Sequence, residues 1–97
     1  MEQSKFVFTG VLLNESNSSG TMTALCLEVD VASEGETIEE AKNNLMEAVS
    51  LYIESAVENN LPLLRPIPKE DNPLLNNQDK IIEKFMLKIN FTVNAYA

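Results

Sequence analysis

The prolines constrain the fold of this chain more than any other feature, because all four lie between Pro62 and Pro73. Proline has no amide proton to donate and disfavours helical geometry in the residue before it. Residues 61–75 are therefore predicted to be extended and irregular. We expect this Pro- and Asn-rich connection to continue to residue 83, with a short helix over 76–83 as the alternative for its last part. Regular structure must then lie on either side of it.

A single amphipathic helix is predicted before the prolines. Thr37 and Glu40 have capping-box spacing, in which the Thr hydroxyl accepts from the Glu40 amide and the Glu40 side chain reaches back. Gly35 permits a sharp turn into the helix, and Asn59 and Asn60 suit its C-terminal cap. Apolar residues at helical spacing form one broad face, which indicates a helix of about six turns. They are Ile38, Ala41, Leu45, Ala48, Val49, Tyr52, Ile53 and Ala56.

Strands are predicted on both sides of the helix. Residues 5–13 and 21–29 are rich in apolar and β-branched side chains and flank a polar hairpin loop at 14–20, and a short strand is expected at 31–33. Residues 85–93 alternate, with Phe85, Leu87, Ile89, Phe91 and Val93 on one face. This order predicts a single α+β domain over residues 1–97, in which an antiparallel-rich sheet carries the long helix on one face.

The net charge of −8 lies in one part of the chain. Nine acidic residues and a single base, Lys42, lie between Glu28 and Glu58, whereas acids and bases balance in the remainder. Such a segment repels nucleic-acid phosphates and attracts basic partners. The alternative is a solvated face that only keeps the protein in solution.

Two features indicate the cellular location. A chain with only one cysteine, Cys26, cannot form an internal disulfide, which is typical of a reducing compartment. No apolar stretch is long enough to be a membrane span, and the N-terminus lacks the pattern of a signal peptide. We therefore expect a cytoplasmic protein without membrane contact.

Residues 23–41, TALCLEVDVASEGETIEEA, resemble the HicB-like antitoxin family. The most specific part is the run from Ser33 to Ala41, Ser-x-Gly-Glu-Thr-x-Glu-Glu-Ala, which opens the long helix. The resemblance extends from residue 23 to 68. It implies a truncated RNase H-like fold and a partner, a small basic HicA-type toxin that cleaves mRNA and whose active face the antitoxin covers. Many members carry a C-terminal DNA-binding module. Residues 94–97 contain no basic element, so no direct nucleic-acid binding is expected.

Catalysis is not expected. The chain has no histidine, the commonest general base and metal ligand, and Cys26 lacks a His partner and fits a small buried side chain. A metal-dependent nuclease would need several converging carboxylates. Strand alternation should spread Glu28, Asp30, Glu34 and Glu36 apart. No cofactor, metal or catalytic residue is therefore predicted.

The candidate partner-binding site is on the helix. At 100° per residue, Glu40, Glu47, Glu54 and Glu58 line up in a narrow row that also contains Leu51. We name Glu47, Leu51, Glu54 and Glu58 the acidic stripe and predict that it contacts a basic toxin. Leu51 could instead lie beneath the Pro-rich segment or simply be exposed.

The alternative function is a stand-alone homo-oligomeric HicB-like domain. Such a domain would self-pair through the strand after Phe85, which has no proline or inward charge to prevent edge pairing. Self-association is expected in either case.

Overall fold

A computed structural model describes residues 2–14, 21–76 and 78–93, and the predicted hairpin loop lies almost wholly outside this range. The strands are β1 (Glu2–Asn14), β2 (Met22–Cys26), β3 (Val31–Gly35) and β4 (Ile81–Val93). The helices are α1 (Ile38–Glu58) and the short α2 (Pro73–Asn76), with 3₁₀ turns η1 (Lys69–Asp71) and η2 (Gln78–Lys80). The predicted α+β class and the order of strands and helix are confirmed.

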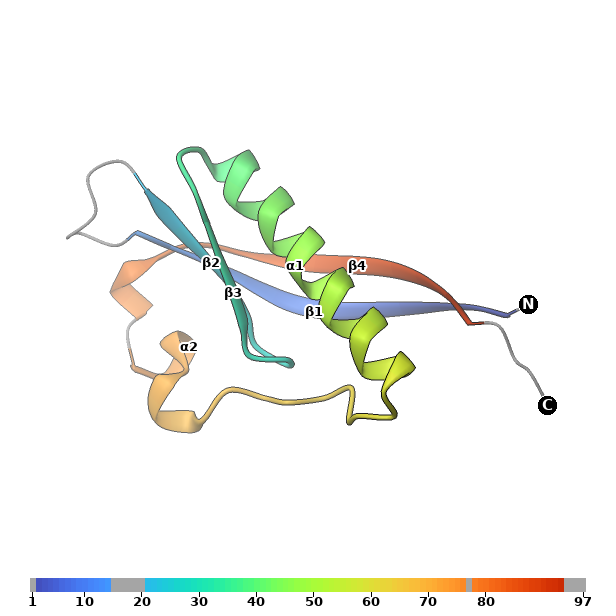
Figure 1. The fold of residues 1–97 in the computed structure, drawn as a ribbon. Helices are drawn as coiled ribbons and strands as arrows, with labels where there is room; N and C mark the ends of the chain where they lie inside the picture. The colour runs from blue at the N-terminus through green and yellow to red at the C-terminus, as the bar shows by residue number, and fades with distance from the viewer. Residues whose placement is uncertain (1, 15–20, 77, 94–97) are drawn as a thin grey trace.

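The four strands form one antiparallel sheet in the order β3-β2-β1-β4 (Figure 1). β1 and β4 have 13 residues each and pair along nearly their whole length, with one irregularity between Leu12 and Leu13. β2 is much shorter and pairs with β1 only from Gly10 to Asn14. The far half of β1 and β4 therefore extends as a two-stranded ribbon beyond the rest of the sheet.

The caps of α1 show why the helix has these limits. The Thr37 hydroxyl accepts a hydrogen bond from the Glu40 amide at 3.0 Å, as predicted. The Glu40 carboxylate accepts from the Glu36 amide, one residue before the N-cap. At the other end Asn60 adopts a left-handed φ of 55°, and the Leu61 amide donates to the Ala56 carbonyl at 2.8 Å. This pattern is a Schellman cap, which satisfies the last carbonyls of the helix.

The core lies between α1 and the sheet. Phe8 and Leu12 of β1, Ala24 and Cys26 of β2, and Leu87 and Ile89 of β4 point toward the helix, as alternation requires. The buried helix residues are Ala41, Leu45, Val49, Ile53 and Ala56. One prediction for the helix face needs correction, because Ile38, in the first turn, is 38% exposed. Ala48 and Tyr52 are half-buried, and Tyr52 packs against the core and donates its hydroxyl to the Pro62 carbonyl.

Gly35 is required for a different reason from the one predicted. Its φ is not in the left-handed range that favours glycine. Instead, a Cβ at this position would overlap the backbone of Ala41, because β3 passes very close to the first turn of α1. The turn residue that does adopt a left-handed φ, of 51°, is Asp30, between β2 and β3.

The connection from 61 to 83 is more ordered than predicted. The amides of Arg65 and Ile67 donate to the carbonyls of Glu28 and Leu27, which fixes the extended part beside the turn after β2. The segment from 69 on is not irregular, since it forms η1 and α2. Pro73 is compatible with α2 because it occupies the first position of the helix, where its missing amide costs nothing. The alternative of a helix over 76–83 is wrong as well, since β4 already begins at Ile81.

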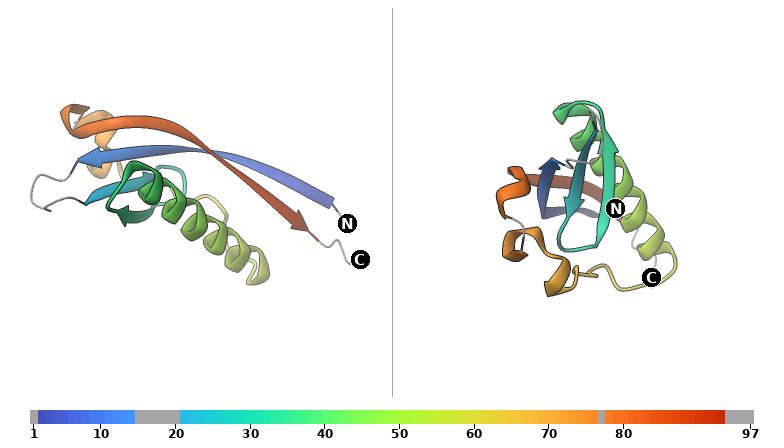
Figure 2. Two further views of the ribbon diagram at one scale, coloured as in Figure 1. Left: turned by 90° about the horizontal axis from the view of Figure 1, so that it is seen from above. Right: turned by 90° about the vertical axis from the view of Figure 1, so that its left-hand side faces the viewer.

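α1 and α2 lie on opposite sides of the sheet in all three views (Figures 1 and 2). On the side away from α1, Val11 is fully buried, whereas Val7 and Met86 are 52% and 63% exposed. The molecule measures 50 × 26 × 19 Å, and its radius of gyration is 14.4 Å. A compact chain of this length would have a radius of about 12.5 Å, so the ribbon makes the domain elongated. No helix in the described parts of the chain is both long and apolar enough to span a membrane.

Candidate functional site

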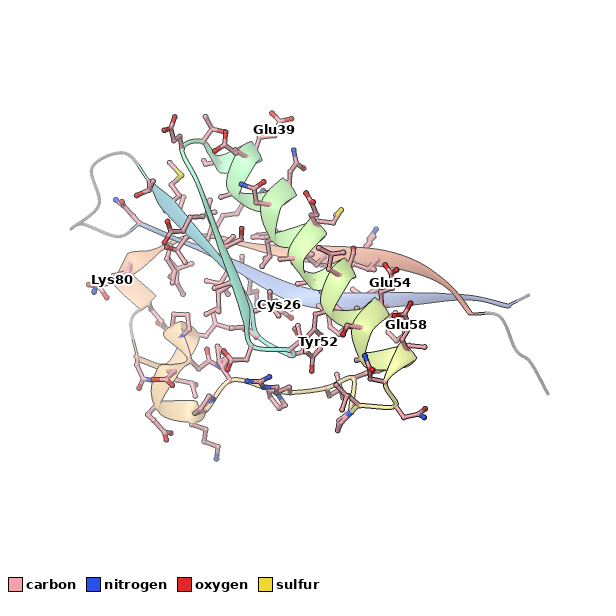
Figure 3. All side chains as sticks on the ribbon, in the orientation of Figure 1. Cys26, Glu39, Tyr52, Glu54, Glu58 and Lys80 are labelled. Atoms are coloured by element: carbon pink, nitrogen blue, oxygen red, sulfur yellow. The ribbon has the colours of Figure 1, made fainter. Side chains whose placement is uncertain are left out.

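The structure brings the four predicted site residues together on the outer side of α1. Glu47, Glu54 and Glu58 are exposed, and Leu51 is 59% exposed. They lie opposite the buried face that runs from Ala41 to Ala56. Figure 3 shows Glu54 and Glu58 projecting from the last turns of the helix. The acidic stripe is thus a continuous outer surface with one apolar side chain within it.

Leu51 is not covered by the Pro-rich segment, which was one of the alternatives for this residue. That segment leaves α1 on the side of Tyr52, whose hydroxyl contacts the Pro62 carbonyl at 3.3 Å (Figure 3). The exposure of Leu51 therefore leaves it available to a partner.

No described cation forms an ion pair with the carboxylates of the stripe. Lys42, the single base between Glu28 and Glu58, forms an ion pair with Glu83 of β4 and lies 4.8 Å from the centre of the Phe85 ring. Among the side chains that the structure describes, no cation lies within ion-pair distance of Glu47, Glu54 or Glu58. Lys42 thus ties α1 to the sheet and, within the described part of the chain, does not pair with the stripe.

An apolar groove of about 680 Å³ was not predicted from the sequence. We call it the Phe6–Leu64 groove, after its lining of Phe6, Val7, Phe8, Pro62, Leu63 and Leu64. Its first wall is the part of β1 beyond the end of β2, where the Phe6 and Phe8 rings are stacked 6.0 Å apart. Its second wall is the start of the connection, where Leu64 is 63% exposed. The one signal in the sequence is the run Leu61-Pro62-Leu63-Leu64, which is strongly apolar for a loop.

A smaller hollow of about 270 Å³ lies between α1 and the connection. Tyr52, Leu61 and Arg65 line it together with Pro62 and Leu64, which it shares with the groove. The exposed Leu64 thus contributes to the lining of both hollows.

Cys26 is buried, and its geometry does not favour nucleophilic chemistry. Burial raises the pKa of the Cys26 thiol to about 11, and the nearby negative charge of Glu28 acts in the same direction. The thiol therefore stays protonated at neutral pH, whereas the reactive form of cysteine is the thiolate.

Of the carboxylates considered for a metal site, that of Glu28 has a structural role. Glu28 accepts a hydrogen bond from the Thr9 amide at 2.7 Å, at the point where β2 leaves β1. Within residues 2–14, 21–76 and 78–93, no three acidic or cysteine side chains are grouped closely enough to hold a metal ion.

Comparison with known proteins gives a curated relative. The chain is 37% identical over 68 residues to "UPF0150 protein ssr1765" of Synechocystis, and the match covers 69% of this chain and 81% of that protein. No protein-family model matches the chain, and no solved structure matches it either.

Proposed function

The chain belongs to the UPF0150 family of small proteins, and we propose that it is an antitoxin-like binding protein that masks a small basic HicA-type toxin. The resemblance of residues 23–68 to HicB-like antitoxins supports this function and supplies the identity of the partner. The observation that carries the proposal is the acidic stripe, an exposed row of carboxylates around the exposed Leu51 with which no described cation forms an ion pair.

The proposed mechanism is masking by a bound protein rather than catalysis. The charge of the stripe steers a basic toxin toward α1, because exposed charges act mainly on the association rate. Leu51 then supplies an apolar contact within the charged surface. The bound domain covers the surface of the toxin that would otherwise meet RNA. No cofactor or metal takes part, and the working location is the cytoplasm.

A test needs the toxin, and the candidate is a basic, toxin-sized protein encoded directly beside this chain. Its association with the wild-type domain is measured by stopped-flow fluorescence over a range of salt concentrations. The test variant replaces Glu47, Glu54 and Glu58 together by Gln, which removes three charges without changing side-chain size. We expect the association rate to fall several-fold and its salt dependence to flatten, since screening acts over about 8 Å at physiological salt.

A matched control removes the same charge elsewhere. Glu70→Gln, Asp71→Asn and Asp79→Asn change three exposed acids outside α1, so they alter the net charge equally but leave the stripe intact. Equal losses in the two triple variants would show that only net charge matters. An unchanged rate and salt slope in the stripe variant would contradict docking at this surface. Glu40 is left unchanged in both, because it belongs to the helix cap.

The second candidate, a stand-alone homo-oligomer without a toxin, is favoured by a different observation. β4 is an edge strand of the sheet along its entire length. A wild-type domain that self-associates but binds no basic protein encoded beside it would support this alternative.

A further inference from the structure

β4 presents one whole side of its backbone to the surroundings. It pairs with β1 on one side from Ile81 to Val93. On its other side, no strand in the part of the chain that the structure describes pairs with it. Figure 2 shows β4 along the outside of the sheet, with the short helices of the connection only near its start. A free edge of this length is a template for pairing with another strand.

The edge has little of the protection that usually prevents such pairing. It contains no proline, and its one acidic residue, Glu83, is already paired with Lys42. Lys84 and Lys88 are exposed on the face away from α1. The buried residues Leu87 and Ile89 are on the face toward α1. The two lysines therefore limit which registers are possible, but they do not block the edge.

We propose that β4 pairs antiparallel with β4 of a second copy, about a two-fold axis that passes through Leu87. Leu87 is the middle residue of β4, so this register pairs the two strands over their full length. Such an interface is isologous and closes as a dimer. Phe85 then lies opposite Ile89 of the second copy on the face toward α1, where the strands already form part of the core.

The lysines distinguish this register from its neighbours. With the axis at Met86, Lys84 would face Lys88 of the second copy, and with the axis at Lys88 the two Lys88 side chains would face each other. Like charges in these positions destabilise a sheet. With the axis at Leu87, Lys88 faces Met86 of the second copy instead. Met86 is 63% exposed, and the aliphatic part of a lysine can cover it.

The resulting dimer has a continuous eight-stranded sheet. A two-fold axis perpendicular to the sheet keeps both α1 helices on the same face. The acidic stripes lie on the outer sides of these helices, away from the new contact. Dimerisation and the proposed masking therefore use separate surfaces, and one can fail without the other.

Charge at position 86 provides the first test, read as the dimer dissociation constant by light scattering and dilution. Met86→Lys places two lysines opposite two lysines, whereas Met86→Glu creates two opposite-charge pairs. At about 0.2–1 kcal/mol for each of the two cross-strand pairs, the first should weaken the dimer roughly two- to thirtyfold and the second should strengthen it. Met86→Gln is the neutral control. A wild-type protein that is monomeric at high micromolar concentration would overturn the proposal, as would equal shifts from Lys and Glu.

Cysteine trapping tests the register. Met86→Cys and Lys88→Cys are prepared as separate proteins and oxidised alone and after mixing. The proposed register puts position 86 opposite position 88, so a disulfide should form only in the mixture. Identical positions are then about 7–8 Å apart, beyond the reach of a disulfide. Cross-linking of the Met86→Cys protein alone, or none in the mixture, would rule out the axis at Leu87. Cys26 can remain, because it is buried and its pKa is about 11.

Discussion

The two faces of the sheet differ in what covers them. Toward α1, alternate residues of β1, β2 and β4 join the helix in one continuous buried cluster. Away from α1, Val11 is fully buried, but farther along the same strand Val7 is 52% exposed. In the described part of the chain, this face is covered only by the short α2 and its neighbouring turns, whereas the other face is covered by the 21 residues of α1.

This difference assigns the two faces different roles. Burial of apolar side chains is the main stabilising contribution in a small domain, so the free energy of folding comes mostly from the α1 side. The other side keeps apolar residues exposed where their burial in the monomer is not needed. Such residues are available for contacts with other molecules.

The largest expected effect tests the packed face. Leu45 is fully buried in the middle of α1, and Leu45→Ala should lower the free energy of unfolding by about 2–5 kcal/mol through lost burial and a cavity. Leu51→Ala, on the exposed side of the same helix, is the matched control and should change it by less than about 0.5 kcal/mol. Both values come from urea denaturation. Similar losses in the two variants would mean that the faces of α1 are assigned wrongly.

Alkaline pH should weaken the packed face as well. Burial raises the pKa of Cys26 from 9.0 to about 11 in the folded protein, so above pH 9 the unfolded chain loses the thiol proton first. Stability is thus complete below pH 9 and declines as the pH rises from 9 toward 11. The loss should reach up to about 2–3 kcal/mol, at 1.36 kcal/mol for each pKa unit. The Cys26→Ala variant, denatured across the same pH range, measures the contribution of the tyrosines and lysines, which is then subtracted. An equal decline of stability in this variant would exclude the thiol as the cause.

The smallest effect is expected on the open face. Val7→Thr keeps a β-branched side chain at an exposed strand position, so the free energy of unfolding should change by less than about 0.5 kcal/mol. Thermal unfolding at low protein concentration, where the monomer dominates, is the measurement. A loss comparable with that of Leu45→Ala would show that the face away from α1 contributes to the core.

Sequence periodicity predicted the elements whose side chains repeat regularly. The helix was found from its 3.6-residue apolar spacing and its cap at Thr37, and β4 from its alternation. In β4 the predicted face is confirmed at Phe85, Leu87 and Ile89. The side chains of Phe91 and Val93 are outside the part of the structure that can be compared.

The connection was predicted less well because its order depends on tertiary contacts. The prolines correctly excluded a long helix, but the extended part of the connection is held in place by the amides of Arg65 and Ile67, which donate to carbonyls in the turn after β2. β4 begins at Ile81 because β1 is long enough to pair with it. Neither the contact of the connection with the turn after β2 nor the pairing of β4 with β1 can be read from the local sequence pattern.

Only part of the candidate site could be predicted, again because local sequence patterns do not reveal tertiary contacts. Helical geometry alone places Glu47, Leu51, Glu54 and Glu58 in one row, so the acidic stripe could be read from their spacing. The Phe6–Leu64 groove combines residues more than fifty positions apart. It exists because β2 stops at Cys26 and uncovers the side of β1 there, which no local pattern reveals.

The unequal lengths of β1 and β2 also divide the backbone into two units with different rates of hydrogen exchange. From Gly10 to Asn14, β1 is a central strand, and its amides exchange only when the sheet opens as a whole. From Glu2 to Phe8 it pairs only with β4, in a ribbon of two strands that can open from its end while the four-stranded part of the sheet stays paired. Protection measured along this single strand should therefore fall abruptly near Thr9. The Thr9 amide donates a hydrogen bond to the Glu28 carboxylate, and the Thr9 carbonyl accepts one from the Leu27 amide.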